Sequence, residues 1–335
     1  MDFRLSDDQE ALRDGIRAFC EGGFPPEKLA ERARAGGFDP AQWRELAGMG
    51  VFGLRLPESQ GGVGLGMGDA VLVFAELGRR LVPGPVLWSH LAAGLLEGAA
   101  SGACVVGGVE VDGGGPLLVE HAAQLDALLV LYPDRVERLE SAALGGEALG
   151  MPLDPLTPMR HVKSLPPGSR LGGPELATRL RLEGAALAAA ELLGIAEATQ
   201  ELAVAYAKQR EQFGRAIGGF QSIKHMLADM FVRQEMARAA VYAAGATLDH
   251  AGREAPGPPS HWPDVGDVAR AVASAKVVAG EAAMRNARAC IQVHGGMGYT
   301  WEMPPHYYLK RTWVLSTCFG SGEEHEEKLA ACLGA

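Results

Sequence analysis

Residues 174–213 read PELATRLRLEGAALAAAELLGIAEATQELAVAYAKQREQF, a stretch dominated by Ala, Leu, Glu and Arg. These residue types favour a helix, and Pro174 suits its first turn because that position needs no backbone N–H donor. The stretch therefore predicts one long helix. Two more long helices are predicted at about 220–250 and 265–293, separated by a proline-rich loop, and two shorter ones at 303–317 and 322–333. Long helices joined by short loops predict an antiparallel bundle.

The chain before this bundle divides into two regions. Helices are predicted from a capping box formed by Ser6 and Gln9 to about residue 99. From 101 to 173, short apolar runs such as 127–132 alternate with Gly, Asp and Pro, which indicates strands and turns. We therefore expect a mostly α protein with a small middle β domain. The predicted division is an N-terminal helical domain at 1–100, a shortened β domain at 101–173 and a C-terminal helical bundle at 174–335.

Composition narrows the classes of partner. The 335 residues include 31 Lys and Arg against 41 Asp and Glu, a formal net charge of −10, which disfavours binding to nucleic acids and anionic membranes. The longest apolar candidate for a spanning helix, 182–195, is interrupted by two glutamates, and the acidic opening residues do not resemble a signal peptide. A cytoplasmic protein is expected. Five widely spaced cysteines without a Cys-x-x-Cys pair predict neither a zinc site nor a disulfide framework.

Two motifs are candidates for ligand binding. The first, KQREQFGR at 208–215, places cations and amides at a helix end beside a glycine, where an anion can be held. The second, QVHGGMGY at 292–299, ends a predicted helix with glycines that permit close approach by a ligand. A solvated helix end and an ordinary helix stop are the alternatives. The alternating glycines at 62–68 do not follow a nucleotide-binding pattern, so a structural turn is expected there.

Taken together, these stretches resemble the acyl-CoA dehydrogenase family over nearly the whole chain. The resemblance rests on Arg210-Glu-Gln-Phe-Gly214 with Phe220-Gln221, on the 292–302 stretch, on LPESQGGVG at 56–64 with Glu76-Leu-Gly78, and on Tyr308 with Arg311. It implies an N-terminal helical domain, a middle β domain and a four-helix bundle, assembled as a dimer of dimers. It also implies an FAD cofactor that reaches from one subunit into the bundle of its neighbour.

The resemblance assigns roles to five residues. It implies that Arg210 pairs with the FAD pyrophosphate, that Gln212 and Phe213 line the cofactor, and that Gln292 and Gly296 meet its adenosine end. A guanidinium suits phosphate oxygens, and a glycine removes the Cβ that would block a ligand. Tyr299 and Trp301 are expected to pack in the bundle, and contact with a ligand is the alternative.

The sequence departs from the family where the family performs its chemistry. The usual catalytic base is a Glu near the C-terminus, and counting from Arg311 places Phe319 at that position. A minority of the family places the base at the start of the first bundle helix. Counting back from Arg210 reaches Gly184, one residue after Glu183, which makes Glu183 a weak candidate. Glu323 and Glu324 are expected to stabilise the start of the last helix through its dipole, and a role as the base is the alternative for them.

The middle region also lacks the residue patterns with which the family usually binds the flavin ring. Residues 101–173 contain no Trp, no Glu-Pro pair and only one Thr. Three hypotheses follow. The first is a short subunit of an α2β2 acyl-CoA dehydrogenase, which completes the FAD site of a full-length homologue; the resemblance associates such subunits with bulky CoA thioesters, including steroid intermediates. The second is a homomeric dehydrogenase that uses Glu183. The third is a non-catalytic scaffold or acyl-CoA-binding protein. No metal site is predicted.

Overall fold

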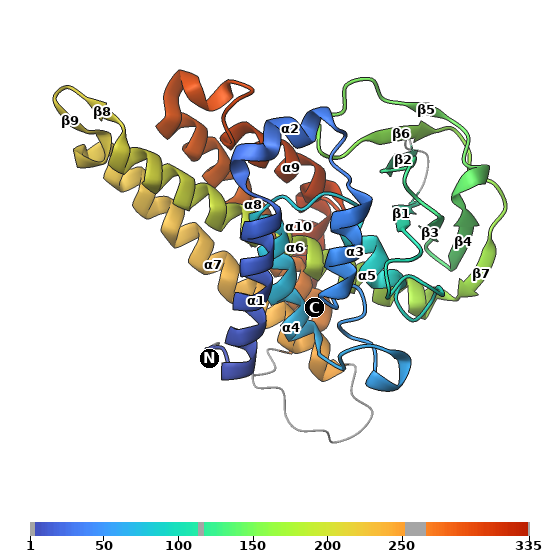
Figure 1. The fold of residues 1–335 in the computed structure, drawn as a ribbon. Helices are drawn as coiled ribbons and strands as arrows, with labels where there is room; N and C mark the ends of the chain where they lie inside the picture. The colour runs from blue at the N-terminus through green and yellow to red at the C-terminus, as the bar shows by residue number, and fades with distance from the viewer. Residues whose placement is uncertain (1–3, 113–116, 252–265, 334–335) are drawn as a thin grey trace. The chain divides into compact units, whose positions relative to one another are not determined.

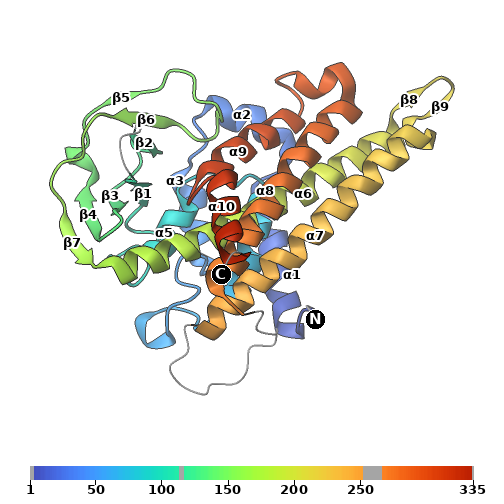
Figure 2. The same ribbon diagram turned by 180° about the vertical axis from the view of Figure 1, so that it is seen from behind.

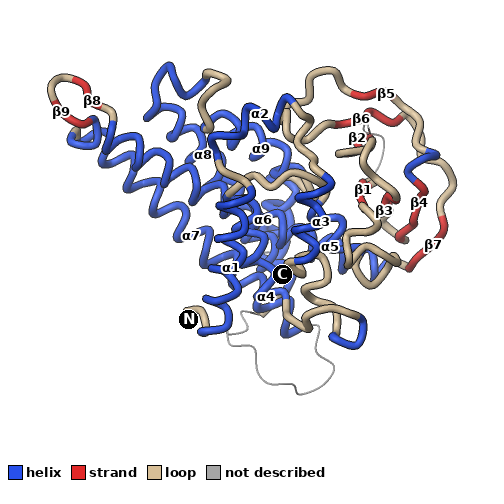
Figure 3. Tube along the Cα trace, in the orientation of Figure 1, coloured by secondary structure: helices blue, strands red, loops and turns tan. Residues whose placement is uncertain are grey.

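The computed structural model describes residues 4–112, 117–251 and 266–333. The chain divides into two compact units, each built from segments far apart in the sequence. One unit contains the residues up to 30, residues 67–82 and residues 185 onward; the other contains 31–66 and 83–184. Figure 3 distinguishes the helices from the strands along the chain. Among the described helices, none combines the length and the apolar character needed to cross a bilayer.

The first unit is a bundle of helices (Figure 1). α7 and α8 pack along each other, α4 packs against α1 and α7, and α9 and α10 both contact α8 (Figure 2). The α-helices of this unit are α1 (Asp7–Gly23), α4 (Met67–Arg79), most of α6 (Pro174–Gln209), α7 (Gln221–Ala251), α8 (Val268–His294), α9 (Pro305–Thr317) and α10 (Gly322–Leu333).

Glycine and alanine let α4 and α6 approach closely. A Cβ atom on Gly194 of α6 would lie 1.9 Å from the carbonyl oxygen of Ala75, and one on Gly78 of α4 would lie 2.2 Å from that of Glu191. Real Cβ atoms do not approach oxygen so closely, so each glycine is required by the other helix's backbone. The α6 residues 185–190 are all buried, five of them alanines. The small side chains of α6 therefore allow it to be enclosed by its neighbours.

The second unit contains two sheets (Figure 1). In the four-stranded sheet the order is β1-β3-β4-β7; β1 and β3 are parallel and the other neighbours antiparallel. The three-stranded sheet has the order β2-β6-β5, and all its pairs are antiparallel. The strands are β1 (Val106–Glu110), β2 (Leu117–Glu120), β3 (Ala127–Leu131), β4 (Val136–Glu140), β5 (Glu147–Ala148), β6 (Met159–Val162) and β7 (Ser169–Gly172).

Two helices and several short turns complete this unit. α3 (Pro40–Gly48) begins at the Asp39 N-cap, and α5 (Val86–Ala92) packs against β1. α2 (Leu29–Arg34) links α1 to α3 in sequence. Buried Val and Leu side chains from strands of both sheets form an apolar core. It includes Leu128 and Val130 of β3, a strand whose residues are all buried. Its short turns η2 (Glu58–Gln60) and η3 (Ser141–Ala143) are single 3₁₀ turns, and a third such turn, η1 (Pro26–Lys28), belongs to the first unit.

The expected fold class, mostly helical with a small β region, is confirmed. The capping box is present, because Ser6 Oγ accepts from the Gln9 amide and Gln9 Oε1 accepts from the Ser6 amide, both at 3.2 Å. One boundary was wrong: α6 ends at Gln209 instead of Phe213, and a two-stranded hairpin, β8 (Glu211–Gln212) and β9 (Arg215–Ala216), follows it. The proline-rich loop at 252–260 lies outside the described residues.

Candidate functional site

A cavity of about 240 Å³ opens within the second unit. Three segments form it: the chain that follows α3, α5 with the turn after it, and the first turns of α6. Its polar side chains come from all three segments, and Phe52, Leu91 and Leu95 contribute apolar walls. The polar lining residues are Arg55, Gln60, His90, Arg179 and Glu183.

Glu183 is the acidic group of this cavity, and Arg55 holds it. Arg55 Nη1 donates to Glu183 Oε2 at 2.9 Å, and Nη2 donates to Oε1 at 2.8 Å, so the guanidinium and the carboxylate meet through two parallel hydrogen bonds. Glu183 is only 8% exposed. Burial acts to raise the pKa of Glu183, but the hydrogen bonds and charge of Arg55 outweigh it, and the pKa is lowered. Glu183 is thus ionised and already paired at neutral pH.

His90 contributes no charge at neutral pH. Its ring is buried, and Nδ1 lies 2.9 Å from the Val51 carbonyl oxygen, which indicates that Nδ1 carries the proton. Burial lowers the pKa of His90 to about 4. The lining therefore holds two guanidinium cations, Arg55 and Arg179, against the single carboxylate of Glu183, an excess of one positive charge.

The structure decides between Glu183 and its neighbour Gly184, the residue reached by counting back from Arg210. Glu183, and not Gly184, lines the cavity. A paired carboxylate with a lowered pKa is a weak proton acceptor, so Glu183 would act as a base only after Arg55 found another partner. Arg55 itself was missed by the sequence analysis, because it lies 128 positions before Glu183 and belongs to no recognisable motif.

Phe319, by contrast, lies in the turn between α9 and α10 of the first unit. Its side chain is 3% exposed and its backbone has φ +56°, a left-handed conformation that is uncommon for a bulky residue. The ring carries no group that exchanges a proton. His325 Nε2 lies 2.9 Å from the Phe319 carbonyl oxygen, and the pKa of His325 falls to about 4, chiefly because it is buried.

A buried lysine holds the same turn. Lys276 of α8 is 2% exposed, and its ammonium donates to the carbonyl oxygens of Leu315, Ser316 and Gly320 at 3.1, 3.2 and 3.0 Å. These three bonds satisfy all three protons of the ammonium group. Glu324 caps the next helix by accepting from the Ser321 amide, and Glu323 lies in the same first turn, as the helix-dipole prediction for both residues expected.

The residues expected to contact FAD lie at one end of the helical bundle. Arg210 follows α6, and its carbonyl accepts from the Ile217 amide at 2.8 Å, which closes the β8–β9 hairpin. Gln212 is exposed and donates to the Glu211 carbonyl at 2.7 Å. Phe213 is 94% exposed at the tip, with φ +53°. The hairpin is seen at the end of α6 and α7 in Figure 1.

The second motif reaches the same end of the bundle. α8 ends at His294, whose ring stacks on Tyr206 of α6 with centroids 4.1 Å apart, four residues before Arg210. Gln292 and Gly296 are exposed. A Cβ on Gly296 would meet no atom within 4 Å, so nothing in this chain requires glycine there. The structure thus brings together both predicted motifs, with their polar groups facing outward.

The prediction for Tyr299 and Trp301 was wrong. Tyr299 ends the short turn η5 (Gly295–Tyr299) and is exposed. Trp301 lies beyond it and is also exposed, with the Lys310 ammonium 4.0 Å from its ring centroid. Both side chains remain outside the bundle because the chain has already left α8 and has not yet entered α9.

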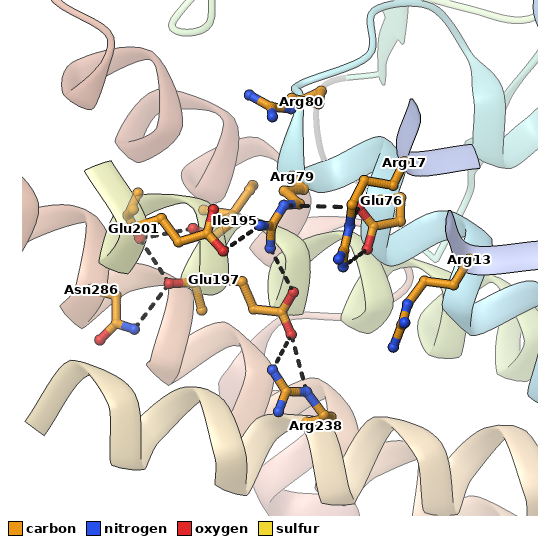
Figure 4. Close-up of polar contacts among 12 residues, drawn as sticks. Arg13, Arg17, Glu76, Arg79, Arg80, Ile195, Glu197, Glu201, Arg238 and Asn286 are labelled. Carbon is orange, nitrogen blue, oxygen red and sulfur yellow. Dashed lines mark hydrogen bonds and ion pairs between the residues drawn. The ribbon is translucent and has the colours of Figure 1, made fainter. Parts of the chain in front are cut away.

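A second charged cluster lies in the first unit and was not predicted (Figure 4). Arg17 of α1 bonds Glu76 of α4 at 2.6 Å, and Arg79 of α4 bonds Glu197 of α6 at 3.3 Å. Arg238 of α7 approaches the same Glu197 at 2.8 Å. These pairs link four helices across a cavity of about 570 Å³. Because its glutamates already pair with arginines, this cluster is best explained as a structural connection.

The glycine-rich loop at 62–68 shows no free anion site at the helix that follows it. The carboxylate of Asp249 accepts from the amides of Met67 and Gly68, at 2.6 and 2.8 Å, at the start of α4. A Cβ on Gly62 would lie 2.2 Å from the Leu56 carbonyl oxygen, so this glycine serves the turn. The interpretation of this loop as a structural turn is supported.

Both ends of the chain match known protein-family models. The family model for the acyl-CoA dehydrogenase N-terminal domain matches residues 6–101, and the model for the C-terminal domain matches residues 173–333. The acyl-CoA dehydrogenase IpdE2 of Mycolicibacterium smegmatis is 30% identical over 98% of this chain and 99% of its own. The chain belongs to the acyl-CoA dehydrogenase family. The resemblance found in the sequence is confirmed.

Two further proteins are similar to this acyl-CoA dehydrogenase family member. Acyl-CoA dehydrogenase FadE34 of Mycobacterium tuberculosis is 34% identical over 92% of this chain, but the match spans only 45% of that longer protein. A chain in the structure of the ChsE4–ChsE5 complex from Mycobacterium tuberculosis shares the fold, with a TM-score of 0.81 and 23% identity over 100% of this chain and 99% of that one. This structural likeness supports the family fold.

Proposed function

We propose that this chain is a subunit of an FAD-dependent acyl-CoA dehydrogenase that binds the adenosine and pyrophosphate half of FAD for a full-length homologue. The observation that carries the proposal is the outward presentation of Arg210, Phe213 and Gln292 at one end of the bundle. A phenylalanine that is 94% exposed contributes almost nothing to its own chain's packing. Its exposure is explained when a neighbouring subunit and a ligand cover it.

The residues at this end fit the proposed cofactor. The guanidinium of Arg210 matches the geometry of phosphate oxygens, and Gln292 offers an amide donor and acceptor. The open space at Gly296 leaves room for a ligand to approach the backbone. FAD, when bound, accepts a hydride from the β-carbon of an acyl thioester. In this proposal the flavin ring, the base and the acyl substrate belong to the partner.

Two observations support dependence on a partner. Phe319, which stands where counting expects the family's base, is buried and has no ionisable group. The solved structure named ChsE4–ChsE5 is itself a complex of two differently named chains. We therefore propose a heterotetramer in which this chain pairs with a full-length acyl-CoA dehydrogenase. Degradation of lipids or steroids is the proposed setting.

The test is the visible spectrum and native mass of the chain, first purified alone and then co-expressed with a full-length homologue encoded beside its gene. We expect a colourless chain alone, and a yellow mixed tetramer with one FAD for each pair of unlike chains. Arg210→Gln is expected to lower flavin occupancy of the mixed tetramer about tenfold or more, since it removes a charge-assisted bond to phosphate. Arg285→Gln, an exposed change on α8, is the control.

A second function is favoured by one observation, the presence of Glu183 in the cavity. In that case the chain is a homomeric dehydrogenase and Glu183 accepts the α-proton once Arg55 is released. A yellow chain with one FAD per monomer, whose turnover is lost in Glu183→Gln, would establish this function. It would also refute the half-site proposal, which requires the chain alone to be colourless.

A further inference from the structure

Two aromatic rings meet where the helices that lead into the two FAD-binding motifs come to an end. Tyr206 lies in the last turn of α6, and His294 is the last residue of α8. Their rings are stacked, with centroids 4.1 Å apart and planes inclined by 24°. Tyr206 is half-buried and His294 is buried. The stack is therefore a direct contact between the ends of α6 and α8.

The backbone of Arg210 in the first motif is tied to Tyr206. The Arg210 amide donates to the Tyr206 carbonyl oxygen at 2.8 Å, which continues the helical pattern one residue past α6. The Arg210 carbonyl oxygen accepts from the Ile217 amide, also at 2.8 Å, at the base of the β8–β9 hairpin. Both backbone groups of Arg210 are thus engaged, and a displacement of Tyr206 also displaces the start of the hairpin.

The second motif is folded around His294. Its Nδ1 lies 2.8 Å from the Cys290 carbonyl oxygen, and burial lowers the pKa of His294, so the ring is neutral at pH 7 with its proton on Nδ1. The Gly295 amide donates to the Gln292 carbonyl oxygen at the end of α8. A Cβ on Gly298 would lie 3.1 Å from the Cβ of His294, so the η5 turn packs directly against this residue. A displacement of His294 therefore moves the backbone of the second motif.

An apolar cluster fixes the same two helix ends against α7. Its buried members include Ala203 and Ala207 of α6, Met230 of α7 and Cys290 of α8, and Tyr206 packs against them. In an interior packed this closely, a ring cannot shift unless its neighbours shift as well. The Tyr206 ring is thus held on one side by this cluster and on the other by the stack with His294.

We propose that the Tyr206–His294 stack is a positioning element that sets the separation of the two motifs, so that one FAD molecule can contact Arg210 and Gln292 at the same time. The inference rests on the proposed function, from which it takes the roles of Arg210 and Gln292. Tyr206 and His294 act through these residues and are positioning residues.

The physical basis is the tight binding of a ligand that reaches two sites at once. Pyrophosphate and adenosine are parts of one FAD molecule, so the first contact presents the other half to its site at a high effective concentration. This gain requires that the two sites lie at the separation set by the ligand. A small shift of one motif leaves each contact possible by itself but prevents both from forming together. The affinity for the joined ligand is then lost, while the affinities for its halves are kept.

The experiment compares ADP, which contains both halves, with inorganic pyrophosphate and adenosine. Each is titrated into the mixed tetramer after removal of its flavin, and the two weaker ligands are measured by competition with ADP. We expect Tyr206→Leu to weaken binding of ADP and of FAD by about tenfold or more, because the joined ligand no longer spans both motifs. Pyrophosphate and adenosine are expected to bind as they do to the wild type.

Tyr206→Phe is the matched control, because it keeps the ring and removes only the hydroxyl group; it is expected to bind ADP like the wild type. His294→Leu removes the other ring of the stack and is expected to weaken ADP binding as Tyr206→Leu does. The double variant is expected to be no weaker than either single variant, since the stack is already lost in each. All titrations are made well below each variant's melting temperature, so that unfolding does not contribute.

Three outcomes with an intact wild type would overturn the inference and leave the proposed function standing. One is unchanged ADP binding in Tyr206→Leu. Another is an equal loss for pyrophosphate or adenosine alone, which would indicate local damage or a direct ligand contact. The third is a double variant whose loss is the product of the two single losses, which would show that the rings act independently. A wild-type complex that binds neither FAD nor ADP would instead refute the proposed function, and the positioning role with it.

Discussion

Glu183 shows how one neighbour determines the chemistry of a side chain. Burial alone would favour its neutral form, whereas the fork of Arg55 stabilises the carboxylate. The pKa of Glu183 in the folded state therefore lies below its value in the unfolded chain, which is about 4.3. A lowered pKa contributes stability above that value, and the contribution is lost as the pH falls through the folded pKa.

This sign gives a prediction for Glu183→Gln. At pH 7 we expect the free energy of unfolding to fall by about 1–3 kcal/mol, because a charged hydrogen-bonded pair is replaced by a neutral amide beside Arg55. The difference from the wild type is expected to shrink as the pH falls below the unfolded-state pKa of about 4.3 and towards the lower folded-state pKa, because Glu183 takes up a proton first in the unfolded chain. Urea unfolding between pH 7 and 3.5 measures it. The exposed Glu147→Gln is the control, and a difference independent of pH would contradict the assignment.

The sequence identified Glu183 as a candidate but not Arg55, the residue that pairs with it and lowers its pKa. The candidate emerged by counting from a motif, which carries no information on contacts. Arg55 follows a buried loop and looks like any surface arginine in the printed chain. Only the fold brings together residues 128 positions apart. The role of Lys276 could not be predicted for the same reason, because the first of its three carbonyl partners lies 39 positions later in the sequence.

Among the elements, the α4–α6 contact depends on glycine. Gly194→Ala would insert a methyl group 1.9 Å from the Ala75 carbonyl oxygen, so the two helices must separate. We expect the free energy of unfolding to fall by more than about 2 kcal/mol, as for other overpacked cores. Gly280 of α8 offers the matched control, since its Cβ would meet no atom within 4 Å.

The control is expected to change stability in the opposite direction. Gly280→Ala removes the entropic cost of a glycine inside a helix, which is worth up to about 1 kcal/mol. Urea or thermal unfolding of the two variants measures both signs in one experiment. If Gly194→Ala were as stable as the wild type, the close approach of α4 and α6 would not exist in solution.

The end of α6 shows why boundaries are harder to predict than elements. Residues 208–212 are good helix formers, so composition extends the helix to Phe213. The chain instead reverses, because Phe213 and Gly214 adopt positive φ values and the Ile217 amide bonds the Arg210 carbonyl. Gly214 was the available signal. The strands and long helices were predicted because their patterns are repeated over many residues.

On the scale of the whole molecule, exposed apolar side chains bear on assembly. Phe231, Val232 and Met236 lie on α7, and each is more than half exposed. Their spacing places them within about 140° of the helix circumference, on one side of α7. Contiguous exposed apolar residues commonly mark an interface, in agreement with the proposed oligomer.

Met236→Glu is therefore expected to reduce assembly without weakening the fold. A charge at a buried interface costs several kcal/mol in association, whereas a solvent-exposed substitution changes unfolding by no more than about 0.5 kcal/mol. Native mass of the co-expressed complex measures the first effect and urea unfolding the second. Met151→Glu, at a methionine that is 93% exposed in the β-containing unit, is expected to change neither. Intact assembly of the Met236→Glu variant would exclude this face of α7 from the interface.

The fold class was predictable because it depends on periodicity, and the family because its motifs are long. How segments gather into compact units was not predictable from these patterns. Residues 67–82 belong with the bundle that begins at 185, while the chain on either side of them belongs to the other unit. Local patterns report which faces are apolar but not which distant segment covers them.

The anchored turn at Phe319 bears on how the chain can evolve. Its backbone is held from two sides, by Lys276 through the Gly320 carbonyl and by His325 through its own. A carboxylate substituted at residue 319 would enter an enclosed position beside backbone already committed to other partners, and it would have to be desolvated there. An acidic residue at this position would first require changes at Lys276 of α8 and His325 of α10, which hold the turn. A single substitution at residue 319 is therefore not enough to place a working carboxylate in this turn.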